Sequence, residues 1–478
     1  MILYLSIIPL LLGGVSLILN QRTKITIVLT FTSLLTSIVI LLFNIGKNFE
    51  MVIGNWGTLG ISIGYDEFAL PFLLAVIVVL SAITLNSLQK NYDGFFYALI
   101  TLLLGSLNAV FITRDLFNVY VSFELASIIG FILIAYGRKG KQIWATVKYM
   151  LISALGFNFY LIGIGLVYMK SGTFSFSALD YMDKLPAVLI FTGLSVKSGL
   201  FLLSMWLPDA HANAITEVSP ILSGLMVKIE DYLVIRFLQY GSFQWLRNFY
   251  LVIGTFSAVA GVLFAMNAKK AKDVLAYHTF SQIGFIIAAS NMAAAWHAFS
   301  HAVFKGLLFM TAGNIKERLG TQKIQEWKGK INIKEYIPLL VGSAAIMGTP
   351  LTSGFVTKNG IMDSISGPAK YFLVVASIGT VISFSKLIFV GVSKEKMKLR
   401  WNMWLAYGIM VAAVFIHGII GFDTHHTLDA LIMIATGIPL FFMLKKFLNP
   451  LPRIFERLDN ALILYLLLFG IMLTFVLE

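Results

Sequence analysis

Hydrophobic residues run along the whole chain in blocks of about 18 to 24, which is the length that a helix needs to cross the hydrocarbon core of a bilayer. Short polar gaps separate the blocks. We expect sixteen helices, with fourteen or fifteen as alternatives, over residues 2–19, 25–44, 67–88, 95–113, 115–136, 146–168, 187–206, 218–236, 248–267, 273–291, 294–314, 336–358, 371–392, 402–421, 427–446 and 460–477. The pattern predicts an all-α, polytopic membrane protein of about 14–16 transmembrane helices.

Basic residues gather in alternate gaps. The gaps after odd-numbered blocks carry clusters such as Arg138, Lys139 and Lys141, whereas the gaps after even-numbered blocks carry few. Cytoplasmic loops of membrane proteins are enriched in Lys and Arg. The alternation therefore predicts a multi-pass protein of the cell membrane with both termini outside. The first block lacks the basic leader and the cleavage site of a signal peptide, so we expect a retained helix.

The composition agrees with a membrane protein and excludes some chemistry. Hydrophobic residues make up 58% of the 478 residues and charged residues only 12%, against about 25% charged in soluble domains. The net charge of +13 follows from the loops and does not indicate nucleic-acid binding. The chain has no cysteine, which excludes disulfides, cysteine-ligated clusters and thiol catalysis. We therefore expect no catalytic residue and no cofactor in this chain.

Two of the predicted helices are interrupted by polar stretches. One stretch, WLPDAHANAITEVSP after the seventh block, contains Asp209, His211 and Glu217, and the other, MGTPLTSGF, lies in the twelfth block. Irregular backbone at membrane depth is tolerated only where it is buried in protein or lines a water-filled cavity. Broken helices at corresponding places in two halves indicate a repeat with an ion pathway at its centre.

The two interruptions divide the chain into four parts. We expect N-terminal helices over 1–94, a first repeat unit over 95–236, a second over 248–392 and C-terminal helices over 402–478. Each unit has five helices, and this odd number predicts that the second unit is inverted relative to the first.

Ionisable side chains lie inside several of the predicted helices. An ionised group at the bilayer centre costs about 2.5–3.5 kcal/mol or more, so such residues must be paired, hydrated or titrated. They therefore predict a route for protons or ions across the membrane. The most prominent are Glu124, Lys197, Lys228, Lys305 and Lys358.

Histidines extend this set. His297, His301 and Lys305 are spaced four residues apart and share one face of a helix, which suits proton transfer through water. His297 at the start of its helix is equally compatible with solvent exposure. The spacing resembles a zinc motif, but Ala298 stands where the general base is needed, so we expect no metal site.

Structural alternatives exist for the other residues. Glu124 could form a plain ion pair between helices, and Lys228 could extend to the interface, as Lys and Arg often do near helix ends. Lys358 could be an interfacial anchor, and His278 a hydrogen-bonded core residue. Lys386 is an intramembrane lysine for which a structural role is equally open.

Five stretches together resemble a known family. They are RDLFNVYVSFELASIIGF, SVKSGLFLLSMWLPDAHANA, SPILSGLMVKIEDYLVIR, AKDVLAYHTFSQIGF with HAFSHAVFKGLLFMTAG, and TPLTSGFVTKNGI. The chain is similar to the antiporter-like subunits of Mrp sodium/proton antiporters (the D-type subunit), of respiratory complex I (the L, M and N subunits) and of membrane-bound hydrogenases. The five stretches follow the order of the family from residue 114 to about 361.

The resemblance implies a proton pathway at matching positions. Its members are Glu124, Lys197, Lys228, His278, His301, Lys305 and Lys358, with His297, Asp209, His211, Glu217 and Lys386 as secondary candidates. The chain departs from the family pattern at a few sites. Glu217 stands where proline is expected, and Glu230 and Asp231 replace small or neutral residues.

The resemblance also implies a function and partners. It implies a proton-translocating subunit of a multisubunit membrane complex, with other membrane subunits as partners and with protons and sodium as transported ions. The complex would be an antiporter or a redox enzyme with iron–sulfur or hydrogenase-like subunits, so membership of an enzyme stays open. An independent secondary transporter of a small solute or cation is the alternative.

Overall fold

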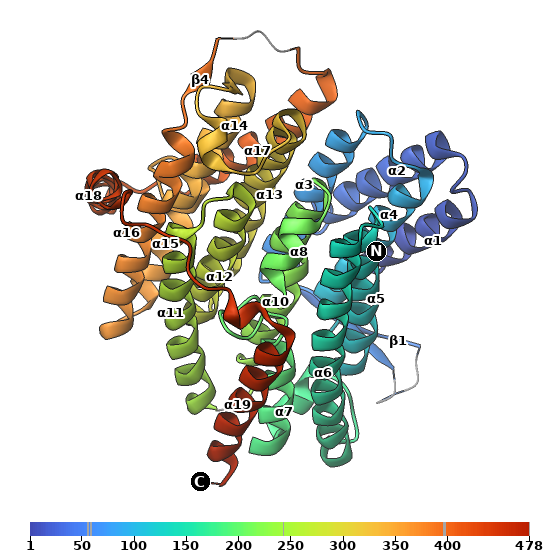
Figure 1. Cartoon of the computed structure of the whole chain (residues 1–478). Helices are drawn as coiled ribbons and strands as arrows, with labels where there is room; N and C mark the ends of the chain where they lie inside the picture. Colours follow the sequence, from blue (N-terminus) through green and yellow to red (C-terminus); the bar gives the residue numbers. More distant parts are fainter. Residues whose placement is uncertain (55–56, 58–59, 242, 395–397, 478) are drawn as a thin grey trace.

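The computed structural model describes residues 1–54, 57, 60–241, 243–394 and 398–477, so the last residue of the chain, Glu478, lies outside it. Within these residues nineteen α-helices form a bundle (Figure 1). Ten of the described helices are long and apolar enough to cross a membrane by length and composition. The chain is a polytopic α-helical membrane protein, as the sequence predicts.

The described helices form sixteen segments when the pieces of each interrupted helix are counted together, and this equals the predicted number. Thirteen of the segments are single helices: α1 (Tyr4–Ile18), α2 (Thr23–Leu42), α3 (Leu70–Ser87), α4 (Gly94–Ile112), α5 (Leu116–Ala135), α6 (Gly140–Ser171), α11 (Gln244–Asn267), α12 (Ala271–Ala289), α13 (Met292–Leu319), α16 (Pro368–Ile388), α17 (Trp401–Ile420), α18 (Thr427–Leu444) and α19 (Leu458–Leu477). Helices α6 and α13 extend beyond their predicted ends.

The other three segments are interrupted. The first consists of α7 (Lys184–Ser195) and α8 (Leu207–Asn213), and the second of α14 (Ile333–Met347) and α15 (Ser353–Ser364). Both breaks lie in the fourth segment of each expected repeat unit, and the second, over residues 348–352, lies where the sequence predicts it. The first comes earlier than predicted, because the helix expected over 187–206 ends at Ser195 and the stretch expected to be irregular contains α8. The third is unexpected, because α9 (Val218–Ile221) continues through a π-helical turn, η3 (Leu222–Met226), into α10 (Val227–Phe237). The inverted relation of the two units remains a prediction.

Serine side chains satisfy the backbone where α7 is interrupted. The Ser204 hydroxyl accepts a hydrogen bond from the Gly199 N–H (2.9 Å) and donates one to the Val196 carbonyl (2.8 Å). Ser257 of α11 accepts a hydrogen bond from the Phe201 N–H at 2.8 Å. Gly199 has φ +76°, a conformation that glycine adopts without penalty. The break is therefore a defined structure, as buried backbone in a membrane requires.

The described residues also contain short strands and 3-10 turns. Strands β1 (Phe49–Ile53) and β2 (Ile61–Tyr65) form an antiparallel hairpin with Phe49 opposite Tyr65, and β3 (Ile331–Asn332) pairs in parallel with β4 (Val392–Ser393). The 3-10 turns are η2 (Phe176–Tyr181), η4 (Ile324–Trp327) and η5 (Ile454–Glu456). The strands depart from the all-α prediction, and β1 and β2 lie in the gap after the second predicted helix.

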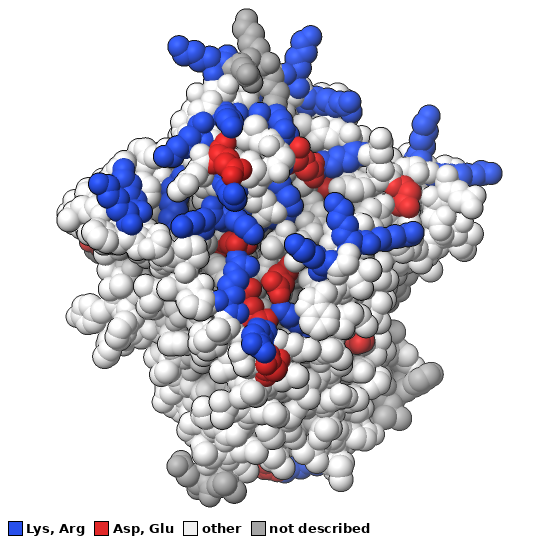
Figure 2. Space-filling view, in the orientation of Figure 1, with Lys and Arg blue, Asp and Glu red and all other residues white. Residues whose placement is uncertain are grey.

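Lysine and arginine gather at one end of the bundle, which we call the basic end. Figure 2 shows them over the upper part of the molecule, whereas the lower half of this face is nearly free of charge. Lys139 and Lys141 at the start of α6 and Lys316 in the last turn of α13 line one hollow there. The segregation agrees with the predicted alternation of basic gaps.

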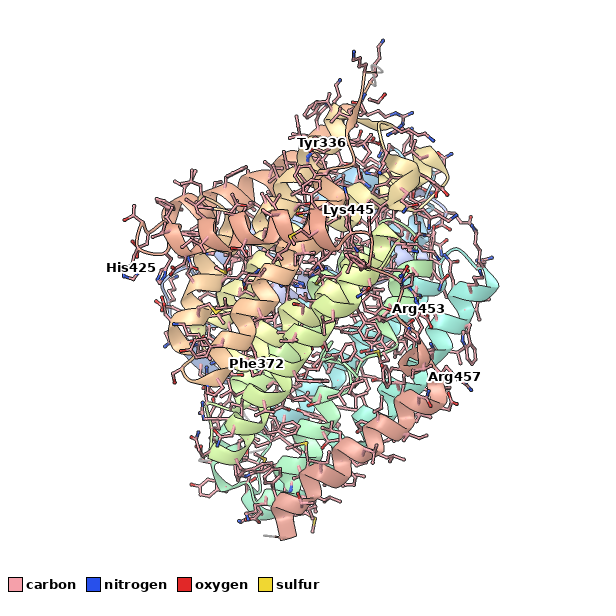
Figure 3. All side chains as sticks on the ribbon, turned by 60° about the vertical axis from the view of Figure 1, so that its left-hand side comes forward. Tyr336, Phe372, His425, Lys445, Arg453 and Arg457 are labelled. Carbon is pink, nitrogen blue, oxygen red and sulfur yellow. The ribbon has the colours of Figure 1, made fainter. Side chains whose placement is uncertain are left out.

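Residues 445–457, which we call the strap, cross the bundle between the last two helices. The strap leaves α18, which packs on α16, and leads to α19, which packs on α7 (Figure 1). In Figure 3, Lys445 marks its beginning, Arg453 lies along it, and Arg457 marks the start of α19. The strap therefore joins the two expected repeat units on one face of the molecule.

Glycines allow α11 and α12 to pack closely. A Cβ atom at Gly284 would lie 2.4 Å from the backbone N of Ala258 and from the backbone O of Gly254. Small residues at helix contacts let backbones approach within a membrane, where no hydrophobic force drives helices together. This contact holds α12, which carries His278, against α11.

We expect Gly284→Ala to destabilise the protein by about 1–3 kcal/mol, because overpacking a tight contact forces the two backbones apart. The matched control is Gly408→Ala in α17, where no atom lies within 4 Å of the added Cβ. That variant should be neutral or slightly stabilising, because alanine favours helix more than glycine. Thermal unfolding in detergent measures both, and equal melting temperatures would contradict this account of the packing.

Candidate functional site

The structure brings the predicted pathway residues together in one buried row. Electrostatic interactions connect Glu124 with Lys197 at one end and link the members from Lys228 to Lys358 at the other, and Glu230 interacts with both Lys197 and Lys228. The row contains Glu124, Lys197, Lys228, His301, Lys305, His278 and Lys358. Apart from Glu124, these side chains are buried in the bundle.

Lys197 lies at the interruption after α7. Its ammonium donates a hydrogen bond to the Ser127 hydroxyl of α5 at 2.6 Å. The rings of Phe123 and Phe157 face the same nitrogen, with centroids at 3.8 and 3.9 Å. Cation–π contacts of desolvated amines contribute about 2 kcal/mol each. These contacts can therefore stabilise the charged form of Lys197 in place of a full hydration shell.

Glu124 on α5 is half-buried rather than enclosed. It interacts electrostatically with Lys197. Its Oε2 atom is buried and has no hydrogen-bond partner among the described residues. The structure therefore places the predicted acid beside the predicted lysine, but at the edge of the molecule.

Lys228 lies inside the protein and does not extend to the surface. Its ammonium forms an ion pair with Asp231, one helical turn further on, at 2.8 Å. Both side chains are fully buried. Extension to the membrane interface, the alternative left open by the sequence, is therefore wrong for Lys228.

The histidine column on α13 is buried along its whole length. His297 contacts the Thr357 hydroxyl through Nδ1 (2.8 Å) and the Gln282 amide oxygen through Nε2 (3.3 Å). The solvent-exposed alternative for His297 is therefore wrong. Both ring nitrogens of His301 are buried without a hydrogen-bond partner among the described residues. Buried polar groups of this kind are commonly satisfied by internal water.

Lys305 and His278 continue the row between α13 and α12. The Lys305 ammonium contacts the Leu275 carbonyl and lies 5.3 Å from the centroid of the Phe309 ring. His278 is fully buried beside Phe384, and neither ring nitrogen has a hydrogen-bond partner within the described residues. His278 is therefore not the hydrogen-bonded core histidine that was left open.

Lys358 follows the second helix break. It is buried, and its ammonium donates to the Ile346 carbonyl near the end of α14 at 2.6 Å. Lys386 behaves differently, because it is only partly buried and donates to carbonyls at the end of α11, including Ala268 at 3.0 Å. Cations at helix C-termini stabilise the exposed carbonyls there. The contacts of Lys386 thus fit a structural role.

The polar residues of the first interruption separate into different surroundings. Asp209 on α8 forms an ion pair with Lys148 of α6. His211, also on α8, is fully buried and stacks on Phe309 at 4.5 Å between ring centroids. It interacts electrostatically with Lys305, so it lies beside the row.

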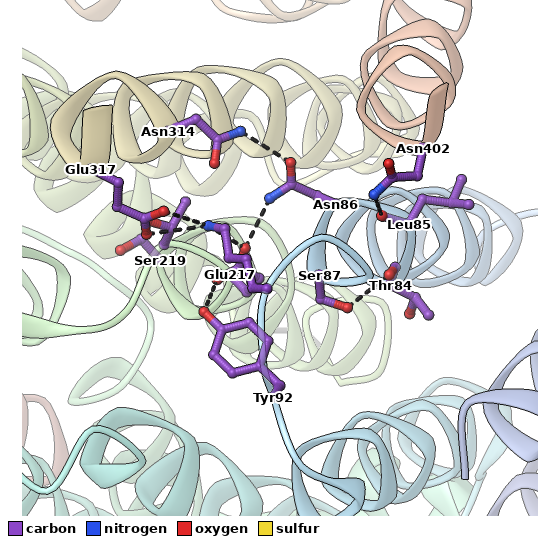
Figure 4. Close-up of polar contacts among 12 residues, drawn as sticks. Thr84, Leu85, Asn86, Ser87, Tyr92, Glu217, Ser219, Asn314, Glu317 and Asn402 are labelled. Carbon is purple, nitrogen blue, oxygen red and sulfur yellow. Dashed lines mark hydrogen bonds and ion pairs between the residues drawn. The ribbon is translucent and has the colours of Figure 1, made fainter. Parts of the chain in front are cut away.

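Glu217 is the centre of a buried polar network at the basic end (Figure 4). Its carboxylate accepts hydrogen bonds from Asn86 (2.8 Å) and Tyr92 and forms an ion pair with Lys90 at 2.6 Å. Lys90 also pairs with Glu317 of α13 at 2.9 Å. The network provides both oxygens of the Glu217 carboxylate with hydrogen-bond partners and connects α3, α9 and α13. A hollow of about 470 Å³ lies beside it, lined by Tyr92, Glu317 and others.

A second charged cluster joins the strap to both units. Arg453 forms ion pairs with Asp273 at the start of α12 and with Glu456 at 3.6 Å. Tyr277 of α12 donates a hydrogen bond to the Glu456 carboxylate, and Lys148 of α6 donates one to its backbone carbonyl at 2.6 Å. Burial raises the pKa of Glu456 to about 7, although Arg453 opposes this shift.

Several members of these clusters were missed in the sequence analysis. Lys90, Lys148 and Lys272 stand near predicted helix ends, where basic residues count as loop charges. Lys272 is in fact buried and donates to the Ser219 hydroxyl at 2.9 Å. Two partners of Glu456, Tyr277 and Lys148, are remote in sequence, so no local signal could have revealed these contacts. Among the described residues, no three His, Cys, Asp or Glu side chains come together as a metal site.

Comparison with known proteins identifies the family. Residues 113–383 match the family model described as "NADH:quinone oxidoreductase/Mrp antiporter, TM". The match covers more than half of the chain and includes all three interrupted segments. The chain belongs to this family, as the motifs predict.

Two relatives and one solved structure illustrate the similarity. The chain is 31% identical over 327 residues to the N subunit of the NADH-quinone oxidoreductase of Desulforudis audaxviator, covering 62% of this chain and 64% of the relative. It is 25% identical over 370 residues to the D subunit of the Na(+)/H(+) antiporter of Alkalihalophilus pseudofirmus, covering 70% and 74%. A chain of the membrane-bound sulfane sulfur reductase, an archaeal respiratory membrane complex, has the same fold, with TM-score 0.80, 22% identity and coverage of 94% and 99%.

The strap cluster should respond to pH. A glutamate with a pKa of about 7 in the folded protein binds its proton more tightly than in an unfolded chain. The protonated Glu456 side chain therefore contributes its full stabilisation to the folded protein below about pH 4. On the order of 3 kcal/mol of this contribution is lost as the pH rises to 7 and the buried carboxyl ionises. Hydrogen exchange of the strap, corrected for intrinsic rates, should become faster over this window.

Glu456→Gln, which stays neutral, should remove this pH dependence. The control is Asp459→Asn at the exposed start of α19, where the pH dependence should persist. A strap whose exchange responds equally to pH in both variants would contradict the assignment.

Proposed function

We propose that this chain is a proton-translocating, antiporter-like subunit of a multisubunit complex in the cell membrane. The observation that carries the proposal is the buried row from Lys197 through Lys228 and Lys305 to Lys358. Its first and last members, Lys197 and Lys358, lie near the two helix breaks, and each amine of the row has polar or aromatic contacts instead of bulk water. Burying several amines is costly, so their presence in line favours a role in transport.

Proton movement in this proposal proceeds by exchange between neighbouring groups. An amine or imidazole releases a proton to the next group or to intervening water when the charge of a neighbour changes. His301 and His278, whose ring nitrogens lack partners among the described residues, supply acceptors between the lysines. The proposal places the basic end in the cytoplasm, because cytoplasmic loops are enriched in Lys and Arg.

The partners follow from the same reasoning. The related chains include a subunit of a sodium/proton antiporter and a subunit of a quinone oxidoreductase. We propose that other membrane subunits surround this chain and that either sodium exchange or a redox partner drives the protons. Affinity purification of the intact complex from native membranes, followed by mass spectrometry, distinguishes these cases. Co-purifying iron–sulfur subunits favour a redox enzyme, and membrane subunits alone favour an antiporter. A chain that purifies alone and remains active would contradict the multisubunit proposal.

We expect Lys197→Ala to lower proton translocation at least tenfold, because positioned proton-transfer groups commonly contribute about 10²–10⁴-fold to rate. The measurement is the initial rate of acidification in proteoliposomes that contain the intact complex. The control is Lys170→Ala, which removes a lysine whose ion pair with Asp183 is solvent-exposed. Unchanged transport in Lys197→Ala would refute the proposed role of the row.

A further inference from the structure

Two adjacent acids on α10, Glu230 and Asp231, follow Lys228, the second lysine of the row. Both side chains are almost completely buried. Consecutive residues of a helix point about 100° apart, so the two carboxylates face different neighbours. Asp231 pairs with Lys228 at 2.8 Å, whereas Glu230 interacts electrostatically with Lys197 and with Lys228.

The backbone before these acids is also unusual. The π-helical turn Leu222–Met226 precedes α10 and changes the register of the side chains that follow. Such turns are rare and occur frequently at functional sites. Gly224 in this turn packs against the backbone of Ala302 on α13, and Gly130 of α5 lies against Met226. The turn thereby fixes α10 against the helices that carry the row.

Each acid keeps one oxygen without a protein partner. Glu230 Oε2 and Asp231 Oδ1 are buried and accept no hydrogen bond from any described residue. An unsatisfied buried acceptor destabilises the fold, so a proton or an internal water molecule is needed there. Glu124, the acid expected from the family pattern, is only half-buried, whereas Glu230 is enclosed.

We propose that Glu230 is a further proton-conducting residue, which carries the proton between Lys197 and Lys228 while Asp231 holds Lys228 in position. The proposal rests on the proposed function and adds a carboxylate to the row. Neither acid belongs to the set implied by the family resemblance, where small or neutral residues stand at these positions.

The transfer requires two balanced steps. First, an N–H bond of the Lys197 ammonium breaks and an O–H bond forms on the Glu230 carboxylate, which leaves a neutral amine and a neutral acid. Second, that O–H bond breaks and an N–H bond forms on the neutral amine of Lys228. Either step can pass through one water molecule, and no other reactant is needed. Asp231 then stabilises the new ammonium at 2.8 Å.

Replacement of Glu230 tests the proposal in the intact complex in proteoliposomes. Glu230→Gln keeps the size of the side chain and removes its titration, so proton translocation should fall at least tenfold. Glu230→Asp keeps a carboxyl group and should retain a substantial part of the rate. The control is Asp183→Asn, which changes an exposed carboxylate far from the row and should leave the rate unchanged.

A spectroscopic readout separates conduction from a merely structural ion pair. Infrared difference spectra of the active wild-type complex should contain a protonated-carboxyl band that disappears in Glu230→Gln and remains in Asp231→Asn. If Glu230→Gln does not assemble, the same band is sought in Glu230→Asp, where a different carboxyl environment should shift it. Absence of a band that depends on residue 230 would overturn the proposal.

The outcomes also distinguish this inference from the proposed function. Full transport in Glu230→Gln together with loss in Lys197→Ala would overturn the role of Glu230 and leave the proposed function intact. Full transport in both variants would instead refute proton translocation through the row.

Discussion

The desolvation of amines is the constraint on which this structure depends. An ammonium removed from water loses several kcal/mol of solvation, which only charge partners, hydrogen bonds or aromatic faces can offset. The buried lysines of the row are stabilised by contacts of different kinds. Lys197 has a hydroxyl and two rings, Lys228 has a carboxylate, and Lys305 and Lys358 have backbone carbonyls. Because these contacts differ in strength, the lysines of the row are not equivalent, and the residues around each amine determine whether it is charged.

The interrupted helices make two of these sets of contacts available, those of Lys197 and Lys358. The last carbonyls before a helix break have no N–H partner within the helix, so they can accept hydrogen bonds from side chains without competition. The break after α14 leaves the Ile346 carbonyl free for Lys358, and the break after α7 positions Lys197. The serine contacts around Ser204 show that the breaks are built structures. The two helix breaks therefore shape the fold and also position Lys197 and Lys358.

Much of this could be predicted from sequence, for identifiable reasons. Hydrophobic blocks are long and their period is simple, so the helix count and the second break were correct, whereas the apolar stretch after Ser195 was predicted to be helical and is instead the first break. The row was found because a lysine inside an apolar block is conspicuous. Tertiary pairing was not accessible: His297 looked terminal yet is buried against Thr357, and Glu124 looked enclosed yet is half-buried. The strap cluster, the π-turn and the β1–β2 hairpin depend on contacts between distant segments or on local geometry without a clear sequence signal.

The position of α19 constrains how the chain is made. Helix α7 is complete when Ser195 has been synthesised, but the helix that covers one of its faces ends only at Leu477. At about 5–20 residues per second, ribosomes need on the order of tens of seconds for the intervening segment. During this time that face of α7 is in contact with lipid or with an insertion factor. The strap is then placed last, across units that are already inserted, so a chain truncated before α19 would leave the face of α7 permanently uncovered.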